Sequence, residues 1–143
     1  MKMKPWGLAL IGSRLLGLGQ VFAQSFAEGQ VWKYKARPGE TGSLLRIAKV
    51  DHDATLGDVF HISIVGLKVK GPKGMVTELP HAPIAKATLE KSVTKLSKSS
   101  VSFPDFQPGY AEWKSAKGGV FSVSVAEIVS LVEQAIFSTS QKP

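Results

Sequence analysis

The stretch DVFHISIV, residues 58–65, decides the fold class of this chain. From Phe60 to Ile64, every second residue is apolar and the residues between are polar. The apolar positions are Phe60, Ile62 and Ile64, and the polar positions between them are His61 and Ser63. Because successive side chains of a strand point to opposite faces of a sheet, this alternation predicts a strand with one apolar face. After Gly66 the apolar phase changes, which predicts a bulge or a bend at that glycine.

Further strands are predicted on both sides of this stretch. Residues 30–35 (QVWKYK) alternate so that Trp32 and Tyr34 share one face and two lysines share the other. Residues 43–50 and 75–79 have a similar pattern, and Pro- and Gly-containing turns separate the segments. Short connections between successive strands favour an antiparallel meander of about four strands.

The second half of the chain has helical periodicity. Residues 86–96 place Leu89, Val93 and Leu96 on one helical face, and residues 108–117 predict a second short helix. The strongest helix begins after Ser124, which forms an S-x-x-E capping box with Glu127.

The apolar stripe of this last helix needs a partner, and the strand face that bears Trp32, Tyr34, Phe60 and Ile62 is the obvious one. We therefore predict an α+β fold: a curved antiparallel meander with the C-terminal amphipathic helix packed on one face, and two shorter helices.

Residues 1–23 have the features of an export signal. Lys2 and Lys4 precede a mostly apolar stretch, and residues 21–23 (VFA) place a small residue directly before the expected signal-peptidase cut after Ala23 and a modest-sized one two positions earlier. A second possible cleavage site follows Ala27. Arg14 interrupts the apolar stretch, so either the charged region extends to Arg14 or the signal is weak. An ordinary N-terminal helix of a cytosolic protein is the alternative to an export signal.

On the export interpretation, residues 24–143 are a single small domain in the periplasm or outside the cell. Arg14 leaves too few uninterrupted apolar residues for a membrane-spanning helix, and without cysteine a lipoprotein anchor is excluded, so we expect no stable membrane anchor. The leader holds three of the 18 basic residues and none of the 11 acidic ones, which lowers the net charge from +7 to +4. This modest charge does not indicate nucleic-acid binding.

Few residues suggest chemistry. The chain has no cysteine, which excludes disulfides, thiol catalysis and zinc–thiolate sites, and no cofactor-binding loop is evident. His52, His61 and His81 match no ligand spacing, and alternation predicts that His61 faces solvent or is lightly packed. Residues 51–58 contain three aspartates, and their spacing is more typical of a solvated loop than of a calcium site. Ser63 lies on the strand face of His61, but no nucleophile-elbow motif is present.

The favoured function is therefore a non-enzymatic exported binding module, with another exported protein or a cell-envelope component as its partner. Candidate surface or cleft residues are Trp32, Tyr34, His61, His81, Lys68 and Lys70. The alternative is a small hydrolase or metal-dependent enzyme that uses His61, His81 and the loop at residues 51–58. No catalytic, metal or cofactor residue is assigned.

Several motifs resemble a family of small uncharacterised bacterial proteins. They are GQVWKYK followed by RPGE (residues 29–40), GDVFHISIVGLKVK (57–70), TELPHAPI (77–84), YAEW (110–113) and GVFSVSVAEIV (119–129). The resemblance covers almost all of the chain after the leader, and it implies one intact domain without implying an activity. Ala85 stands where a helix-capping Ser is typical of the family.

Overall fold

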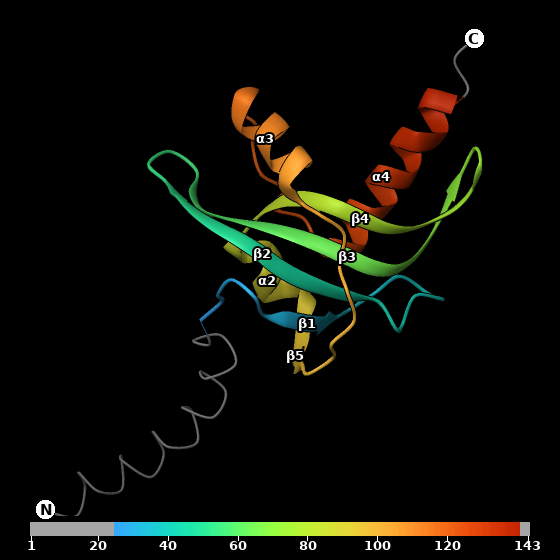
Figure 1. The fold of residues 1–143 in the computed structure, drawn as a ribbon, viewed down its shortest axis with the longest axis horizontal. Coiled ribbons are helices and arrows are strands. Elements are labelled where there is room, and N and C mark those ends of the chain that lie inside the picture. Colours follow the sequence, from blue (N-terminus) through green and yellow to red (C-terminus); the bar gives the residue numbers. More distant parts are fainter. Residues whose placement is uncertain (1–24, 141–143) are drawn as a thin grey trace, which may run out of the picture.

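The computed structural model describes residues 25–140, which form one antiparallel sheet and three helices (Figure 1). The strands are β1 (Val31–Tyr34), β2 (Leu44–Asp53), β3 (Gly57–Gly71), β4 (Gly74–Ala85) and β5 (Val93–Ser97). The helices are α2 (Lys86–Ser92), α3 (Gln107–Ser115) and α4 (Val125–Ser140). The sheet order is β4-β3-β2-β1-β5, and every neighbouring pair is antiparallel. The predicted α+β fold, a curved meander with a C-terminal helix, is confirmed.

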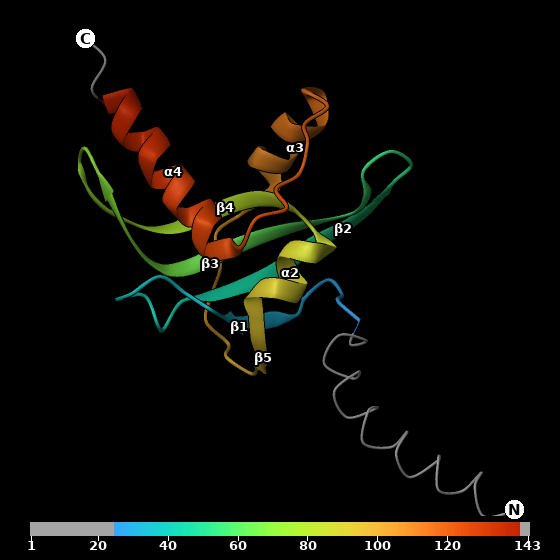
Figure 2. The same cartoon turned by 180° about the vertical axis from the view of Figure 1, so that it is seen from behind.

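The two faces of the sheet carry different layers. On one face, Phe60, Ile62 and Ile64 of β3 belong to a buried cluster that also includes Leu89 of α2 and Val125 of α4. Helix α3 lies on the opposite face, in front of the sheet in Figure 1, whereas α2 and α4 are in front in Figure 2. The alternation of β3 therefore predicted its two faces correctly.

The predicted start of α4 is confirmed in atomic detail. The Glu127 backbone N–H donates to Ser124 Oγ at 3.2 Å, and the Ser124 N–H donates to Glu127 Oε1 at 3.4 Å. These reciprocal bonds satisfy two N–H groups that have no partner within the helix.

Gly66, where the apolar phase changes, has a φ of +78° and lies at an irregularity in the β3–β4 pairing, which confirms the predicted bulge.

The helix predicted over residues 86–96 is wrong in its second half. Helix α2 ends at Ser92, and the next five residues form β5, which pairs with β1 so that Leu96 lies opposite Trp32. The backbone N–H and C=O groups along the free edge of β1 would have no strand to pair with if α2 were longer. The β-branched residues Val93 and Thr94 also favour a strand. The sheet therefore gains a fifth strand. Ala85 at the start of α2 makes no side-chain capping bond.

The leader predicted over residues 1–23 lies outside the described residues. Within residues 25–140, no helix is both long enough and apolar enough to cross a membrane.

Candidate functional site

Three polar side chains from neighbouring strands form a hydrogen-bonded chain on the sheet face opposite the core. Asp51 lies on β2, His61 on β3 and His81 on β4. The Nε2 atom of His61 is 3.1 Å from Asp51 Oδ2, and its Nδ1 atom is 2.8 Å from His81 Nε2. The structure thus brings together two histidines that lie far apart in the sequence and Asp51. The loop predicted over residues 51–58 is wrong in extent, because β2 continues to Asp53, paired with β3, and only residues 54–56 form the turn.

Helix α3 covers this chain. The Tyr110 hydroxyl donates to Asp51 Oδ2 at 2.9 Å. The rings of Tyr110 and Trp113 lie edge-on to the His61 imidazole, with centroid distances of 4.7 Å and 4.6 Å. As a result His61 is fully buried, so the prediction that it faces solvent is wrong. The strand pattern gave the correct face, but the helix that buries this face comes from a distant part of the sequence.

The protonation states follow from the surroundings of each group. Burial raises the pKa of Asp51, but the Tyr110 hydrogen bond and the adjacent His61 outweigh it and hold this pKa below its usual value. Burial lowers the pKa of His61, and burial together with the neighbouring His61 lowers that of His81 to about 4. Both imidazoles are therefore neutral at pH 7.

An ionised Asp51 fixes the direction of the hydrogen bonds. His61 must donate from Nε2 to the carboxylate, so its Nδ1 accepts the N–H of His81 Nε2. The Nδ1 atom of His81 is then left as a bare acceptor, and it has no partner among the described residues. No buried side-chain nitrogen or oxygen of these residues lacks a hydrogen bond, so this atom must reach solvent.

The other proposed enzymatic groups are not assembled. Ser63 is buried and donates its hydroxyl to the Pro80 carbonyl at 2.7 Å, so it is not available as a nucleophile. His52 pairs with Asp58 at 2.6 Å in the exposed hairpin. Within residues 25–140, no group of three or more histidines or carboxylates is arranged to hold a metal ion.

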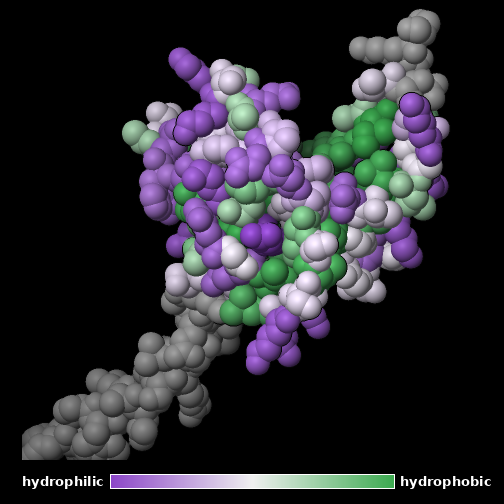
Figure 3. All heavy atoms as spheres, in the orientation of Figure 1, coloured by the Kyte–Doolittle hydropathy of each residue, from purple (hydrophilic) through white to green (hydrophobic). Residues whose placement is uncertain are grey.

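A cleft of about 510 Å³ opens beside the hydrogen-bonded chain, between the β2–β3 hairpin and the end of α3. It is lined by Asp51, His52, Asp53, Thr55 and Leu56 on one side and by Trp113, Lys114, Lys117, Gly118 and Gly119 on the other. Figure 3 shows that polar side chains gather over α3 and this hairpin. The cleft is within the size range of small-molecule sites.

The turn after α3 builds one wall of this cleft and places a lysine in an unusual conformation. The N–H groups of Gly118 and Lys117 donate to the carbonyls of Trp113 and Lys114, at 2.9 Å and 3.2 Å. This is the Schellman pattern, whose left-handed position is usually glycine. Here that position is Lys117, with a φ of 52°. The next position must be glycine, because a Cβ on Gly118 would lie 2.4 Å from the Trp113 ring.

Two of the predicted surface residues belong to the core. Trp32 and Tyr34 are only 3% and 6% exposed. Because α4 and α2 cover the face to which they point, they offer no aromatic surface to a partner, and this part of the prediction is wrong. Apolar surface lies along α4 instead (Figure 3), where Leu131 is 47% exposed.

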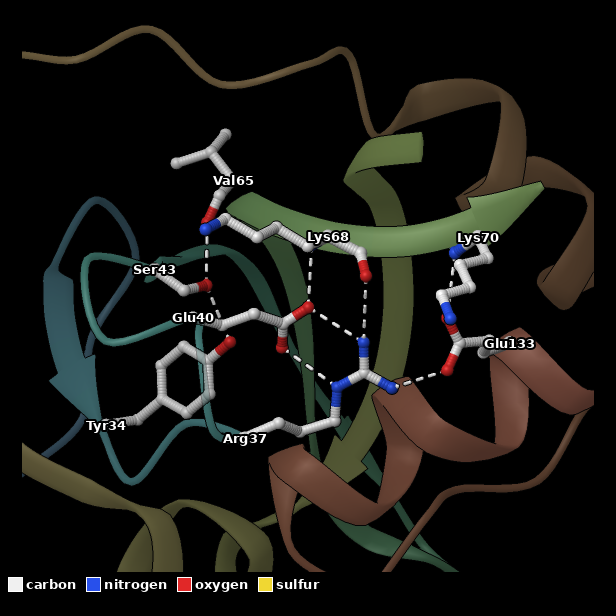
Figure 4. Close-up of polar contacts among 8 residues, drawn as sticks. All are labelled: Tyr34, Arg37, Glu40, Ser43, Val65, Lys68, Lys70 and Glu133. Atoms are coloured by element: carbon white, nitrogen blue, oxygen red, sulfur yellow. Dashed lines mark hydrogen bonds and ion pairs between the residues drawn. The ribbon is translucent and has the colours of Figure 1, made fainter. Parts of the chain in front are cut away.

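The side chains of Lys68 and Lys70 are exposed, as predicted, but their backbone has a structural role. Glu40 accepts the Lys68 N–H at 2.6 Å, and Glu133 accepts the Lys70 N–H at 2.7 Å. Arg37 bonds both carboxylates, with two contacts to Glu40 and one to Glu133 (Figure 4). This network joins the RPGE turn, β3 and α4, and it explains why the turn carries an arginine and a glutamate.

The site residues missed in the sequence are those of α3. Tyr110 and Trp113 are three residues apart and share a helical face, which was a usable signal for a packed surface. Nothing in the sequence linked that face to His61, however. Comparison with family models, curated proteins and solved structures finds no match to this chain. Function must therefore be argued from the site alone.

Proposed function

We propose that this protein is an exported binding protein whose ligand occupies the cleft between the β2–β3 hairpin and α3. The observation that carries this proposal is the state of Asp51. Its Oδ2 atom is held by His61 and Tyr110, its Oδ1 atom accepts no hydrogen bond from the described residues, and Asp51 is one of the residues that line the cleft. An ionised carboxylate fixed by two donors is a rigid acceptor for a ligand.

The rest of the wall is also pre-organised. Trp113 is locked by an indole N–H bond to the Gly119 carbonyl at 2.8 Å and by the close packing of Gly118. A binding site that is ordered before the ligand arrives avoids part of the entropic cost of binding. The available Asp51 carboxylate and the fixed Trp113 ring together favour a small polar molecule as the ligand.

Ligand-detected and protein-detected NMR test this proposal. A mixture of small polar metabolites (amino acids, sugars, nucleotides and carboxylic acids) is added to the isotope-labelled protein. We expect shifts in the amide signals of Gly118 and Gly119 and in the Trp113 indole N–H. If no compound shifts these signals, or if the shifts map to α4 instead, the cleft is not the ligand site.

A second candidate function is acid–base catalysis, because the Asp51–His61–His81 chain ends at a solvent-accessible Nδ1 atom. In an ester hydrolysis, a water would attack the carbonyl carbon while Nδ1 of His81 takes its proton. The acyl C–O bond would then break, and the imidazolium would return the proton to the departing alcohol oxygen. We rank this function second, since a pKa of about 4 makes His81 a weak base at neutral pH. Hydrolysis of p-nitrophenyl acetate that is lost in His81→Gln would reverse the ranking.

Export is tested separately. In a bacterial host we expect the protein in the periplasm or medium, with an intact mass that corresponds to a chain beginning at Gln24. A species that still begins at Met1 in the cytosol would contradict the proposed export.

A further inference from the structure

The charged groups of the cleft lie close together without neutralising one another. The Lys114 Nζ atom is 3.3 Å from the Tyr110 hydroxyl, which in turn bonds Asp51 Oδ2 at 2.9 Å. One hydroxyl group thus separates an ammonium from a carboxylate, and no ion pair within residues 25–140 joins them. Each can therefore accept a further partner of opposite charge.

The charges of the lining restrict the ligand class. Two lysines, Lys114 and Lys117, line the same cleft as two aspartates, Asp51 and Asp53. The Asp53 carboxylate already accepts the N–H groups of the next turn, so Asp51 is the carboxylate left for a ligand. A multiply charged anion would be repelled by the carboxylates, and a simple cation would be repelled by the lysines. A neutral ligand would leave these charges partly desolvated without a counter-charge. A zwitterion satisfies both signs at once.

The spacing narrows the class further. Because a single hydroxyl lies between the ammonium of Lys114 and the carboxylate of Asp51, the two ligand charges must also be close to each other. A free α-amino acid carries both charges on one carbon, whereas each peptide unit would add about 3.8 Å of chain between them. The Trp113 ring and Leu56 also line the cleft and offer an apolar surface for a side chain.

We propose that the cleft binds a free α-amino acid with an apolar side chain, its ammonium on Asp51 and its carboxylate on Lys114 and Lys117. This proposal rests on the proposed function and adds the chemical class of the ligand.

Calorimetric titration with three matched compounds tests the class. L-phenylalanine carries both charges, L-phenylalaninamide lacks the carboxylate, and N-acetyl-L-phenylalanine lacks the ammonium. We expect saturable binding of phenylalanine and at least tenfold weaker binding of the other two. Equal affinity for all three, or binding of only one of the two derivatives, would overturn the amino-acid assignment.

Variants then assign the two contacts. Lys114→Gln is expected to weaken phenylalanine binding at least tenfold while leaving the weak binding of the amide unchanged, because the amide has no carboxylate to lose. Asp51→Asn should weaken binding of both ammonium-bearing compounds. Lys98→Gln, on an exposed lysine outside the cleft, is the matched control and should bind as the unaltered protein does. Loss of affinity in the control, or none in Lys114→Gln, contradicts the contacts.

The outcomes separate this inference from the proposed function. If amino acids fail but another compound of the NMR mixture shifts the Gly118 and Trp113 signals, the cleft remains a ligand site and only the amino-acid class is wrong. If no compound shifts these signals, both proposals fail.

Discussion

Replacement of Lys117 by glycine should make the protein more stable and a poorer binder at the same time. Lys117 has a φ of 52° at the position where a Schellman turn normally has glycine. The left-handed conformation costs a residue with a Cβ about 1–2 kcal/mol. Glycine removes this cost. It also raises the conformational entropy of the unfolded chain, which lowers the stability of the folded protein by about 0.5–1 kcal/mol. The net gain expected for Lys117→Gly is therefore about 0.5–1 kcal/mol.

Urea unfolding measures this gain. We expect a higher midpoint with an unchanged m value, and a melting temperature higher by roughly 2–6 °C. Lys117→Ala is the matched control, because alanine removes the ammonium and keeps the Cβ. Both variants should bind phenylalanine more weakly, but only the glycine variant should be more stable. If Lys117→Gly is no more stable than Lys117→Ala, the left-handed conformation of Lys117 costs no stability and the predicted gain is wrong.

Three further predictions concern the hydrogen-bonded chain and the last helix. Tyr110→Phe removes a hydrogen bond to the charged Asp51 and should lower the free energy of unfolding by about 1.5–3 kcal/mol; an unchanged urea midpoint would contradict this. His81 has a folded-state pKa of about 4 against 6.5 for its ordinary value, so the unfolded chain binds more protons between these pH values. The free energy of unfolding should therefore fall as the pH drops from 6.5 towards 4, and this fall should be smaller in His81→Gln. Equal urea midpoints at pH 6.5 and 4.5 for the unaltered protein would refute the prediction. Ser124→Ala removes the cap that Glu127 shares and should cost about 0.5–2 kcal/mol, seen as a lower melting temperature.

Local patterns predicted those parts of the fold that local interactions determine. The alternation around Phe60 and His61 assigned each to the correct face, and the Ser124–Glu127 pair located the start of α4. Local patterns failed where a distant segment decides the outcome. The spacing of Leu89, Val93 and Leu96 fits a helix, but the free edge of β1 draws the second half into the sheet.

The candidate site shows the same limit. Each histidine looked like an ordinary polar residue in the sequence, because the residues that bury His61 come from α3. The strand face that carries Trp32 was predicted to pack against the C-terminal helix, and this is confirmed, so the same residues could not also be a surface for a partner. The sequence did not indicate that Leu89 of α2 would join the buried cluster on this face.

The Glu40 and Glu133 carboxylates also have a consequence for self-association. Strand β2 begins at Leu44, opposite Val65, so the N–H groups of Lys68 and Lys70 lie beyond the paired part of this edge of β3. Two acidic side chains occupy the positions that a neighbouring strand would otherwise fill, and a strand from another molecule must displace them before it can add to the sheet. In strong acid, where both groups become neutral and bind these N–H groups less well, we expect the edge to be more open to a strand from another molecule.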